Sequence, residues 1–192
     1  MQPWAAKRCD AIGCGKGTLG RAVDDTMDPY ITSCAPFGIP RLMNHAGPLE
    51  ILQTPGRVLM LFETGNSQRQ IWTDGRGHPA DLDSTWMGNS IGRWDGDTLV
   101  VDTIGQDDKT VVDNYRTPHS AKIHVVERWK MINDGQKLQV TYTVDDPDAF
   151  NAPWSAIRNY RRVQQPMSEE VCAENNRNLF DYHIPVAAKP DF

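Results

Sequence analysis

Glu127 is the residue whose sequence setting most clearly suggests chemistry. It lies in the strand-like run KIHVVERWKMI (122–132), where alternate side chains would face opposite sides of a sheet. One face would carry His124 and Arg128, and the other would carry Glu127 among apolar residues. A carboxylate in such a place must be paired with a cation or have a raised pKa, and in the second case it could act as a general acid or base.

Further charged residues that could complete this site also lie on strand-like runs, namely Glu63, Arg69, Asp102 and Arg128. We expect Glu127 to act as acid or base, with His124 and Asp102 in support. Arg69 or Arg128 would bind an anionic or carbonyl oxygen of the substrate, and Glu63 would also contact it. Alternatively, these residues form ion pairs that fix the strand register, or they lie at a solvated barrel rim.

One connection between strand-like runs is rich in side chains that could bind or react. The segment GRGHPADLDSTWMGNS (75–90) contains His78, Asp81, Asp83, Trp86, Asn89 and Ser90. Loops held by a rigid β-scaffold often carry function, so Trp86 and Ser90 are candidate substrate contacts. In the alternative reading, Asp81 and Asp83 cap turns and Trp86 closes one end of a barrel.

The histidines favour acid–base chemistry over metal binding. His119, His124 and Glu127 form an H-x4-H-x2-E run, but on a strand His124 and Glu127 would face opposite sides. Zinc sites at such spacings rely on a helix. We therefore expect no metal, although a histidine-ligated metalloenzyme stays open as a third hypothesis. GxSxG, HExxH and P-loop motifs are absent from the sequence, and we expect no cofactor.

The elements that must position these residues are short and β-like. Turn dipeptides such as Pro55-Gly56 and Asp95-Gly96 separate eight strand-like runs. We place these runs at 49–54, 57–64, 68–74, 86–94, 97–105, 122–132, 136–146 and 154–163. Consecutive hairpins form a meander, and without a strongly amphipathic helix the sheet must cover itself.

The predicted fold is therefore mainly β, an antiparallel up-and-down lipocalin-like barrel of about eight strands. A two-sheet sandwich is the alternative. An eight-stranded barrel can hold one small ligand. We expect an irregular N-terminal arm over residues 1–47, the barrel over 48–165, and a C-terminal helix and tail over 166–192. A short helix near Pro3 to Arg8 and another over 172–182 are also expected.

Composition restricts the classes of partner. The chain has 192 residues and a mass of 21.6 kDa, with 39 % hydrophobic and 23 % charged residues, which suits one globular domain. The net charge is −5 without a basic cluster, so nucleic acid and anionic membrane surfaces are poor partners. No apolar run approaches the roughly 20 residues of a membrane-spanning helix.

Four cysteines point to an oxidising compartment. Cys9 and Cys14 could close a small loop, whereas a bridge between Cys34 and Cys172 would close a long one; the sequence leaves the pairing open. Zinc spacing fits poorly, so two disulfides are favoured. The first residues lack the apolar core of a signal peptide, and we expect a periplasmic or secreted chain from which that peptide has been removed.

Several longer runs resemble an uncharacterised family of secreted bacterial proteins, abundant in soil acidobacteria and sphingomonads. The similar stretches include DPYITSCAPFGIPRLM, LEILQTPGRVLMLFE and TVDDPDAFNAPW, and the specific part is a GxWxGDTLVVDT motif at residues 92–103. The resemblance covers about residues 28–175 and implies export, but it implies no activity. The family pattern lacks the Cys9/Cys14 pair, which therefore looks like a local addition.

These observations favour an exported small-molecule enzyme. A barrel pocket would bind a partly apolar organic substrate and perform cofactor-free acid–base chemistry, as a lyase, isomerase or hydrolase. The alternative is a non-catalytic periplasmic ligand-binding protein with the same pocket. Unpaired edges of an incompletely closed barrel could also support a homodimer.

Overall fold

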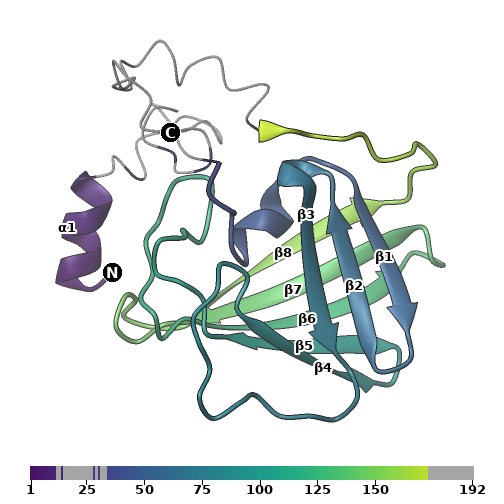
Figure 1. The fold of residues 1–192 in the computed structure, drawn as a ribbon, viewed down its shortest axis with the longest axis horizontal. Coiled ribbons are helices and arrows are strands. Elements are labelled where there is room, and N and C mark those ends of the chain that lie inside the picture. Colours follow the sequence, from purple (N-terminus) through teal and green to yellow (C-terminus); the bar gives the residue numbers. More distant parts are fainter. Residues whose placement is uncertain (12–13, 15–27, 29, 31–33, 173–192) are drawn as a thin grey trace, which may run out of the picture.

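A computed structural model describes residues 1–11, 14, 28, 30 and 34–172, and it confirms the mainly β fold (Figure 1). Eight strands form one curled sheet in sequence order, shaped like a half-barrel. They are β1 (Leu49–Thr54), β2 (Arg57–Phe62), β3 (Ser67–Trp72), β4 (Asn89–Asp95), β5 (Thr98–Ile104), β6 (His124–Ile132), β7 (Lys137–Asp145) and β8 (Trp154–Arg161). Each lies within, or within one residue of, a strand-like run of the sequence.

The pairing of β3 with β4 departs from the up-and-down prediction. All other neighbours are antiparallel, but β3 and β4 are parallel and pair only at Ile71–Ser90 and Trp72–Ile91. Residues 73–88 leave the end of β3, pass outside the sheet and return beside the start of that strand. The chain then runs in the same direction as β3, so β4 begins beside the end of β3. The sheet is therefore weakly joined at this point.

The end of the N-terminal arm fills the concave side of the half-barrel. Its 3-10 helix η2 (Arg41–Asn44) and the residues before it bury four apolar side chains, each at most 1 % exposed: Phe37, Ile39, Leu42 and Met43. They belong to one core cluster with inward-facing residues of β2, β3, β5, β6 and β7. We name residues 37–45 the plug, because this segment occupies space that a lipocalin-like barrel would offer to a ligand.

Hydrogen bonds fix the plug to the last two strands. The hydroxyl of Tyr160 donates to the carbonyl oxygen of Met43 at 2.6 Å, and the amide of Asn44 lies 2.9 Å from the hydroxyl of Tyr142. Arg158 donates to the carbonyl oxygen of His45 at 3.3 Å. The plug thus lies within the curl of the sheet rather than only against its edge.

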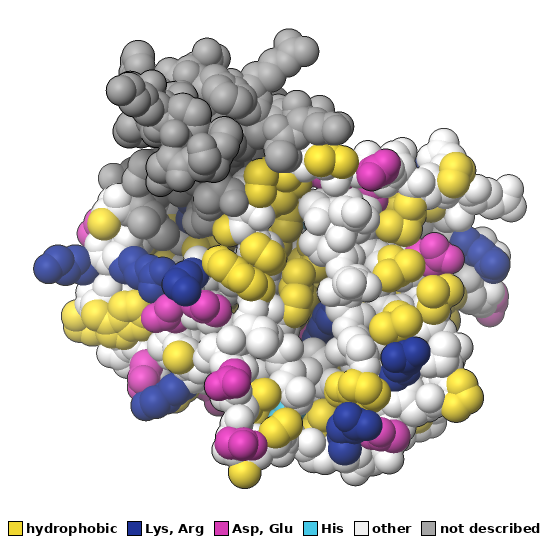
Figure 2. Space-filling model, viewed as in Figure 1, with side chains coloured by type: hydrophobic (Ala, Val, Ile, Leu, Met, Phe, Trp, Pro, Cys, Tyr) yellow, Lys and Arg dark blue, Asp and Glu magenta, His cyan; other side chains and the backbone are white. Residues whose placement is uncertain are grey.

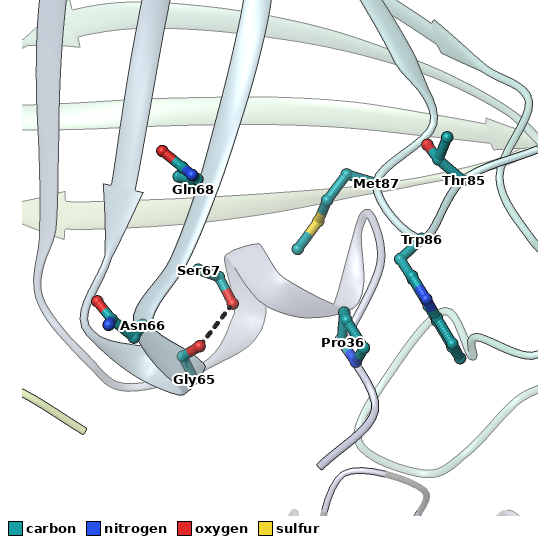
Figure 3. Close-up of a pocket in the computed structure, with 8 residues that line it drawn as sticks. All are labelled: Pro36, Gly65, Asn66, Ser67, Gln68, Thr85, Trp86 and Met87. Atoms are coloured by element: carbon teal, nitrogen blue, oxygen red, sulfur yellow. Dashed lines mark hydrogen bonds between the residues drawn. The ribbon is translucent and has the colours of Figure 1, made fainter. Parts of the chain in front are cut away.

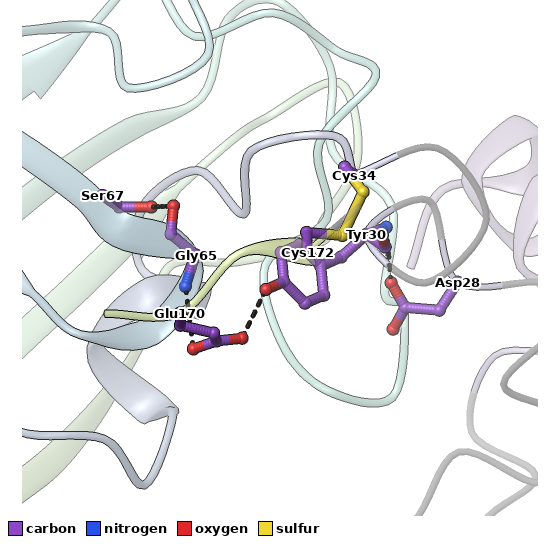
Figure 4. Close-up of a disulfide and its surroundings, with 7 residues drawn as sticks. All are labelled: Asp28, Tyr30, Cys34, Gly65, Ser67, Glu170 and Cys172. Atoms are coloured by element: carbon purple, nitrogen blue, oxygen red, sulfur yellow. Dashed lines mark hydrogen bonds between the residues drawn. A yellow bond between two sulfur atoms is a disulfide. The ribbon is translucent and has the colours of Figure 1, made fainter. Parts of the chain in front are cut away.

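The described part of the C-terminal tail straps β8 to the turn between β2 and β3. That turn contains the short 3-10 helix η3 (Thr64–Asn66). The backbone amide of Ser168 donates to Glu63 at 2.6 Å, and Glu170 accepts from the amide of Gly65 at 3.1 Å and from the hydroxyl of Tyr30 (Figure 4). We call residues 162–172 the strap.

Two disulfides are present, Cys9–Cys14 and Cys34–Cys172, and the second fastens the strap to the arm (Figure 4). Helix α1 (Pro3–Ala11) confirms the expected N-terminal helix and lies against the loops around Asp108 and Ala149. The helix expected over 172–182 lies outside the described residues, apart from Cys172. No helix in the described ranges is long and apolar enough to cross a membrane.

Candidate functional site

Glu127 is completely buried inside the half-barrel, where it forms a two-pronged ion pair with Arg69. Nη1 and Nη2 of Arg69 lie 2.8 Å and 2.6 Å from the two carboxylate oxygens. Arg69 is 2 % exposed and Glu127 is 0 % exposed. Both side chains point inward because they occupy inward-facing positions of β3 and β6.

Neighbouring side chains complete the bonding of this pair. Arg69 also donates to the hydroxyls of Ser90, at 3.0 Å, and Thr103, at 2.7 Å. The indole of Trp129 donates to Glu127 at 2.8 Å. The network joins β3 to β4, β5 and β6 across the weakly paired part of the sheet. This geometry favours the register-fixing role of the pair, because both carboxylate oxygens are already engaged.

Asp102 and His124 face the opposite, convex side of the sheet. Oδ1 of Asp102 lies 2.9 Å from Nε2 of His124 and 3.1 Å from Nε2 of His78. Nδ1 of His78 lies 2.7 Å from the side-chain oxygen of Asn89. We name these four residues the imidazole cluster. The sheet itself separates Glu127 from the two residues expected to assist it.

The imidazole cluster has the residue types for proton transfer. A carboxylate that holds an imidazole fixes its orientation and stabilises its charged form. The His124 side chain is 40 % exposed and the Asp102 side chain 41 %, so a molecule in solution can reach both. Among the described residues, no group of three or more His, Cys, Asp or Glu side chains could hold a metal ion.

The other predicted site residues are dispersed. Arg128 lies on the convex side and pairs with Asp95 at 2.8 Å. Glu63 accepts the strap's amide at Ser168. Asp81 and Asp83 are exposed on the 73–88 connection. Of the predicted set, the structure brings together Arg69, Ser90 and Glu127 inside, and Asp102 with His124 outside.

Trp86 lies at an open hollow where the sheet is split (Figure 3). The hollow has a volume of about 390 Å³ and lies between the start of β3 and the segment before β4. Its lining residues are Pro36, Gly65, Asn66, Ser67, Gln68, Thr85, Trp86 and Met87. We name it the rim hollow. It exists because β3 and β4 pair at only two positions, leaving residues 67–70 without a strand neighbour on that side.

The lining of the rim hollow is neutral. Pro36, Trp86 and Met87 provide apolar surface, whereas Asn66 and Gln68 provide amide groups. The ammonium of Lys109 lies 5.9 Å from the centroid of the Trp86 ring. The space-filling view shows the corresponding face hollowed near its centre, with apolar side chains beside the hollow and a basic side chain visible at depth (Figure 2).

Sequence reasoning found only Trp86 of this lining. Gly65 and Asn66 lie in the turn between β2 and β3, and this turn also forms one wall of the hollow. The missing information was the parallel placement of β4, which no residue pattern indicates.

Two histidines, the buried His119 and the partly buried His45, serve the fold. Nε2 of His119 lies 2.6 Å from the hydroxyl of Thr110, and burial lowers the pKa of His119 below its usual value. Burial, assisted by the nearby Arg41 charge, lowers the pKa of His45 to about 4. Both rings therefore remain neutral at physiological pH.

Comparisons of the chain with protein-family models, with curated proteins and with solved structures found no match.

Proposed function

We propose that the protein is an extracytoplasmic binding protein for a small, neutral, partly apolar molecule, and that the rim hollow is its binding site. The observation that carries this proposal is a hollow of about 390 Å³, of which the described lining residues include no ionisable side chain. Ligand pockets commonly combine apolar walls with a few polar groups that orient the ligand.

The lining supports a neutral ligand. Trp86 and Met87 offer an aromatic and a thioether surface for an apolar group. Asn66 and Gln68 can both donate and accept hydrogen bonds, which suits hydroxyl, carbonyl or amide groups. None of the described side chains that line the rim hollow would itself supply a counter-ion to a charged group bound against it.

The walls of the rim hollow are held in place before a ligand arrives. Gly65 is bonded to Glu170 of the strap, and Pro36 follows two residues after the disulfide-bonded Cys34. Such preorganisation lowers the entropy lost on binding. Two disulfides also support a periplasmic or secreted location, in agreement with the family resemblance of the sequence.

The test is titration of the protein with the neutral fluorescent amine N-phenyl-1-naphthylamine. We expect saturable binding with one site per chain, and at least a tenfold rise in Kd for Trp86→Ala. Trp94→Ala is the matched control, because this tryptophan is 51 % exposed at the far end of β4. Equal Kd values for Trp86→Ala and the wild type would contradict the proposal.

A second candidate function is acid–base catalysis by the imidazole cluster. The observation that favours it is the contact of one Asp102 oxygen with both His78 and His124. The reaction would be a proton transfer of the lyase, isomerase or hydrolase type. Here Glu127 would only hold strands together.

This second function is tested with p-nitrophenyl esters for hydrolysis, and with deuterium exchange next to a ketone carbonyl for isomerase or lyase chemistry. Turnover that Asp102→Asn and His124→Gln both abolish, and Trp86→Ala preserves, would support it. Turnover that Glu127→Gln alone abolishes in a folded protein would instead restore Glu127 as the acid–base group.

A further inference from the structure

Strand β1 leaves a bare edge at one side of the curled sheet. Among the residues that the structure describes it pairs only with β2, and four of its six residues are exposed: Glu50, Leu52, Gln53 and Thr54. An exposed edge strand without proline or lysine invites pairing with another strand.

The register determines which backbone groups of β1 are free to pair. Glu63 donates its amide to the carbonyl oxygen of Pro48, so this opposed pair is of the hydrogen-bonded type. Hydrogen-bonded pairs alternate, so Glu50, Leu52 and Thr54 direct their backbone groups toward β2. Leu49, Ile51 and Gln53 therefore direct theirs away from the sheet.

We propose that β1 is a dimer interface, where the β1 edges of two copies pair antiparallel about a two-fold axis at Leu52. In this register Ile51 of each copy opposes Gln53 of the other, and their outward amides and carbonyls form four hydrogen bonds. The two Leu52 residues oppose each other as a non-hydrogen-bonded pair, in which side chains come closest.

The side chains on the convex face suit this arrangement. Leu52 lies opposite Leu59 of β2, so the dimer would align four leucines across the joined sheets. Leu52 is 41 % exposed in the single chain, and pairing would cover part of this surface.

Charge complementarity selects the second copy as the partner. Glu50 and Arg57 form no salt bridge within the described residues, and Nε of Arg57 lies 3.4 Å from the hydroxyl of Thr54. In the proposed register Glu50 opposes Thr54 of the other copy. The Arg57 guanidinium beside that Thr54, in the same copy, then faces Glu50 of the first copy. The two-fold symmetry produces this contact twice.

The mass of the protein in solution tests the interface by sedimentation equilibrium between 1 and 200 µM. We expect a dimer whose Kd rises at least tenfold in Glu50→Arg and in Arg57→Glu. The double variant, Glu50→Arg with Arg57→Glu, exchanges the charges and should return Kd to within threefold of the wild type. Arg128→Glu, on the convex face of β6, is the control and should leave Kd unchanged.

A disulfide tests the position of the axis. Leu52→Cys should form a covalent dimer in air, because antiparallel non-hydrogen-bonded pairs lie within disulfide range. Gln53→Cys, one residue further along the strand, should not. Circular dichroism establishes that each variant is folded. A monomeric wild type at 200 µM, or a dimer that Leu52→Cys cannot link, would overturn the proposal.

Discussion

Glu127 lies where the sequence predicts it, but its contacts favour a structural role over the expected catalytic one. The alternation of β6 correctly predicts that it faces inward among apolar residues, with His124 on the other face. The same alternation could not show that Arg69, 58 residues earlier, would occupy both carboxylate oxygens. Such a contact depends on the long-range pairing of strands, which lies beyond local periodicity.

Replacing Glu127 with Gln should strongly destabilise the fold, because the Arg69 guanidinium would remain buried without its counter-charge. We expect a loss of about 3–5 kcal/mol in the free energy of unfolding, measured by urea denaturation. Arg128→Gln is the matched control at the next position, where the exposed pair with Asp95 should contribute little. Similar losses in the two variants would contradict a structural role for the buried pair.

The lowered pKa values of His45 and His119 predict a loss of stability at acid pH. An unfolded imidazole binds its proton near pH 6.5, whereas the pKa of His45 in the folded chain is about 4. Between these values the unfolded state holds more protons, so stability falls as pH falls, by up to about 1.4 kcal/mol per pH unit. His119, whose pKa is also lowered, adds to the effect in the same direction.

Urea denaturation at pH 7.5, 6.5, 5.5 and 4.5 measures this dependence. His45→Gln should flatten the slope below pH 6.5, because the substituted side chain does not titrate. His124→Gln, on the partly exposed convex face, serves as the comparison. A wild-type stability that stays constant from pH 7.5 to 4.5 would exclude the proposed linkage.

At the scale of elements, the sequence predicts well where the strands lie, but it predicts the relative direction of only some neighbouring strands. Hairpin signals such as Asp95-Gly96 specify antiparallel neighbours, because a two-residue turn permits no other arrangement. The connection 73–88 has no such constraint, so the parallel β3–β4 contact could not be predicted. The rim hollow depends on that contact and was therefore hidden as well.

Gly88 lies where the 73–88 connection enters β4, and its replacement should be costly. Its φ is +68°, and an added Cβ would lie 2.6 Å from the carbonyl oxygen of Ile104. We expect Gly88→Ala to lower the free energy of unfolding by roughly 1–3 kcal/mol and to weaken probe binding at the rim hollow. Gly77→Ala, in the same connection but in open space, should alter neither measurement. Equal stability of the two variants would show that the entry to β4 tolerates a side chain.

At the scale of the whole molecule, the plug fills the concave side of the half-barrel, and the strap ties β8 to the turn between β2 and β3. The plug was not predictable, because Phe37, Ile39, Leu42 and Met43 follow neither a helical nor a strand period. Proline and glycine around them indicated an irregular segment, but its burial depends on contacts with β7 and β8, which are distant in the sequence. The even cysteine count did predict the disulfides, but not the strap that one of them secures.

Removing the long-range disulfide should destabilise the molecule more than removing the local one. The partners are separated by 138 positions in Cys34–Cys172 and by 5 in Cys9–Cys14. The chain-entropy relation gives losses of about 5 and about 2 kcal/mol for the paired serine variants. Urea denaturation of both variants provides the comparison. A smaller loss for Cys34→Ser/Cys172→Ser would mean that the strap stays in place without its covalent link.

The spacing of the cysteines also has a consequence for biosynthesis. The chain is made from its N-terminus, so Cys9 and Cys14 can meet almost at once, whereas Cys34 must wait for Cys172. Closing a short loop costs less entropy than closing a long one, so the local bridge is expected to form first. It then removes two competing thiols, and Cys34 is left with one correct partner when the strap arrives. The local disulfide would in this way protect the newly made chain from mispairing.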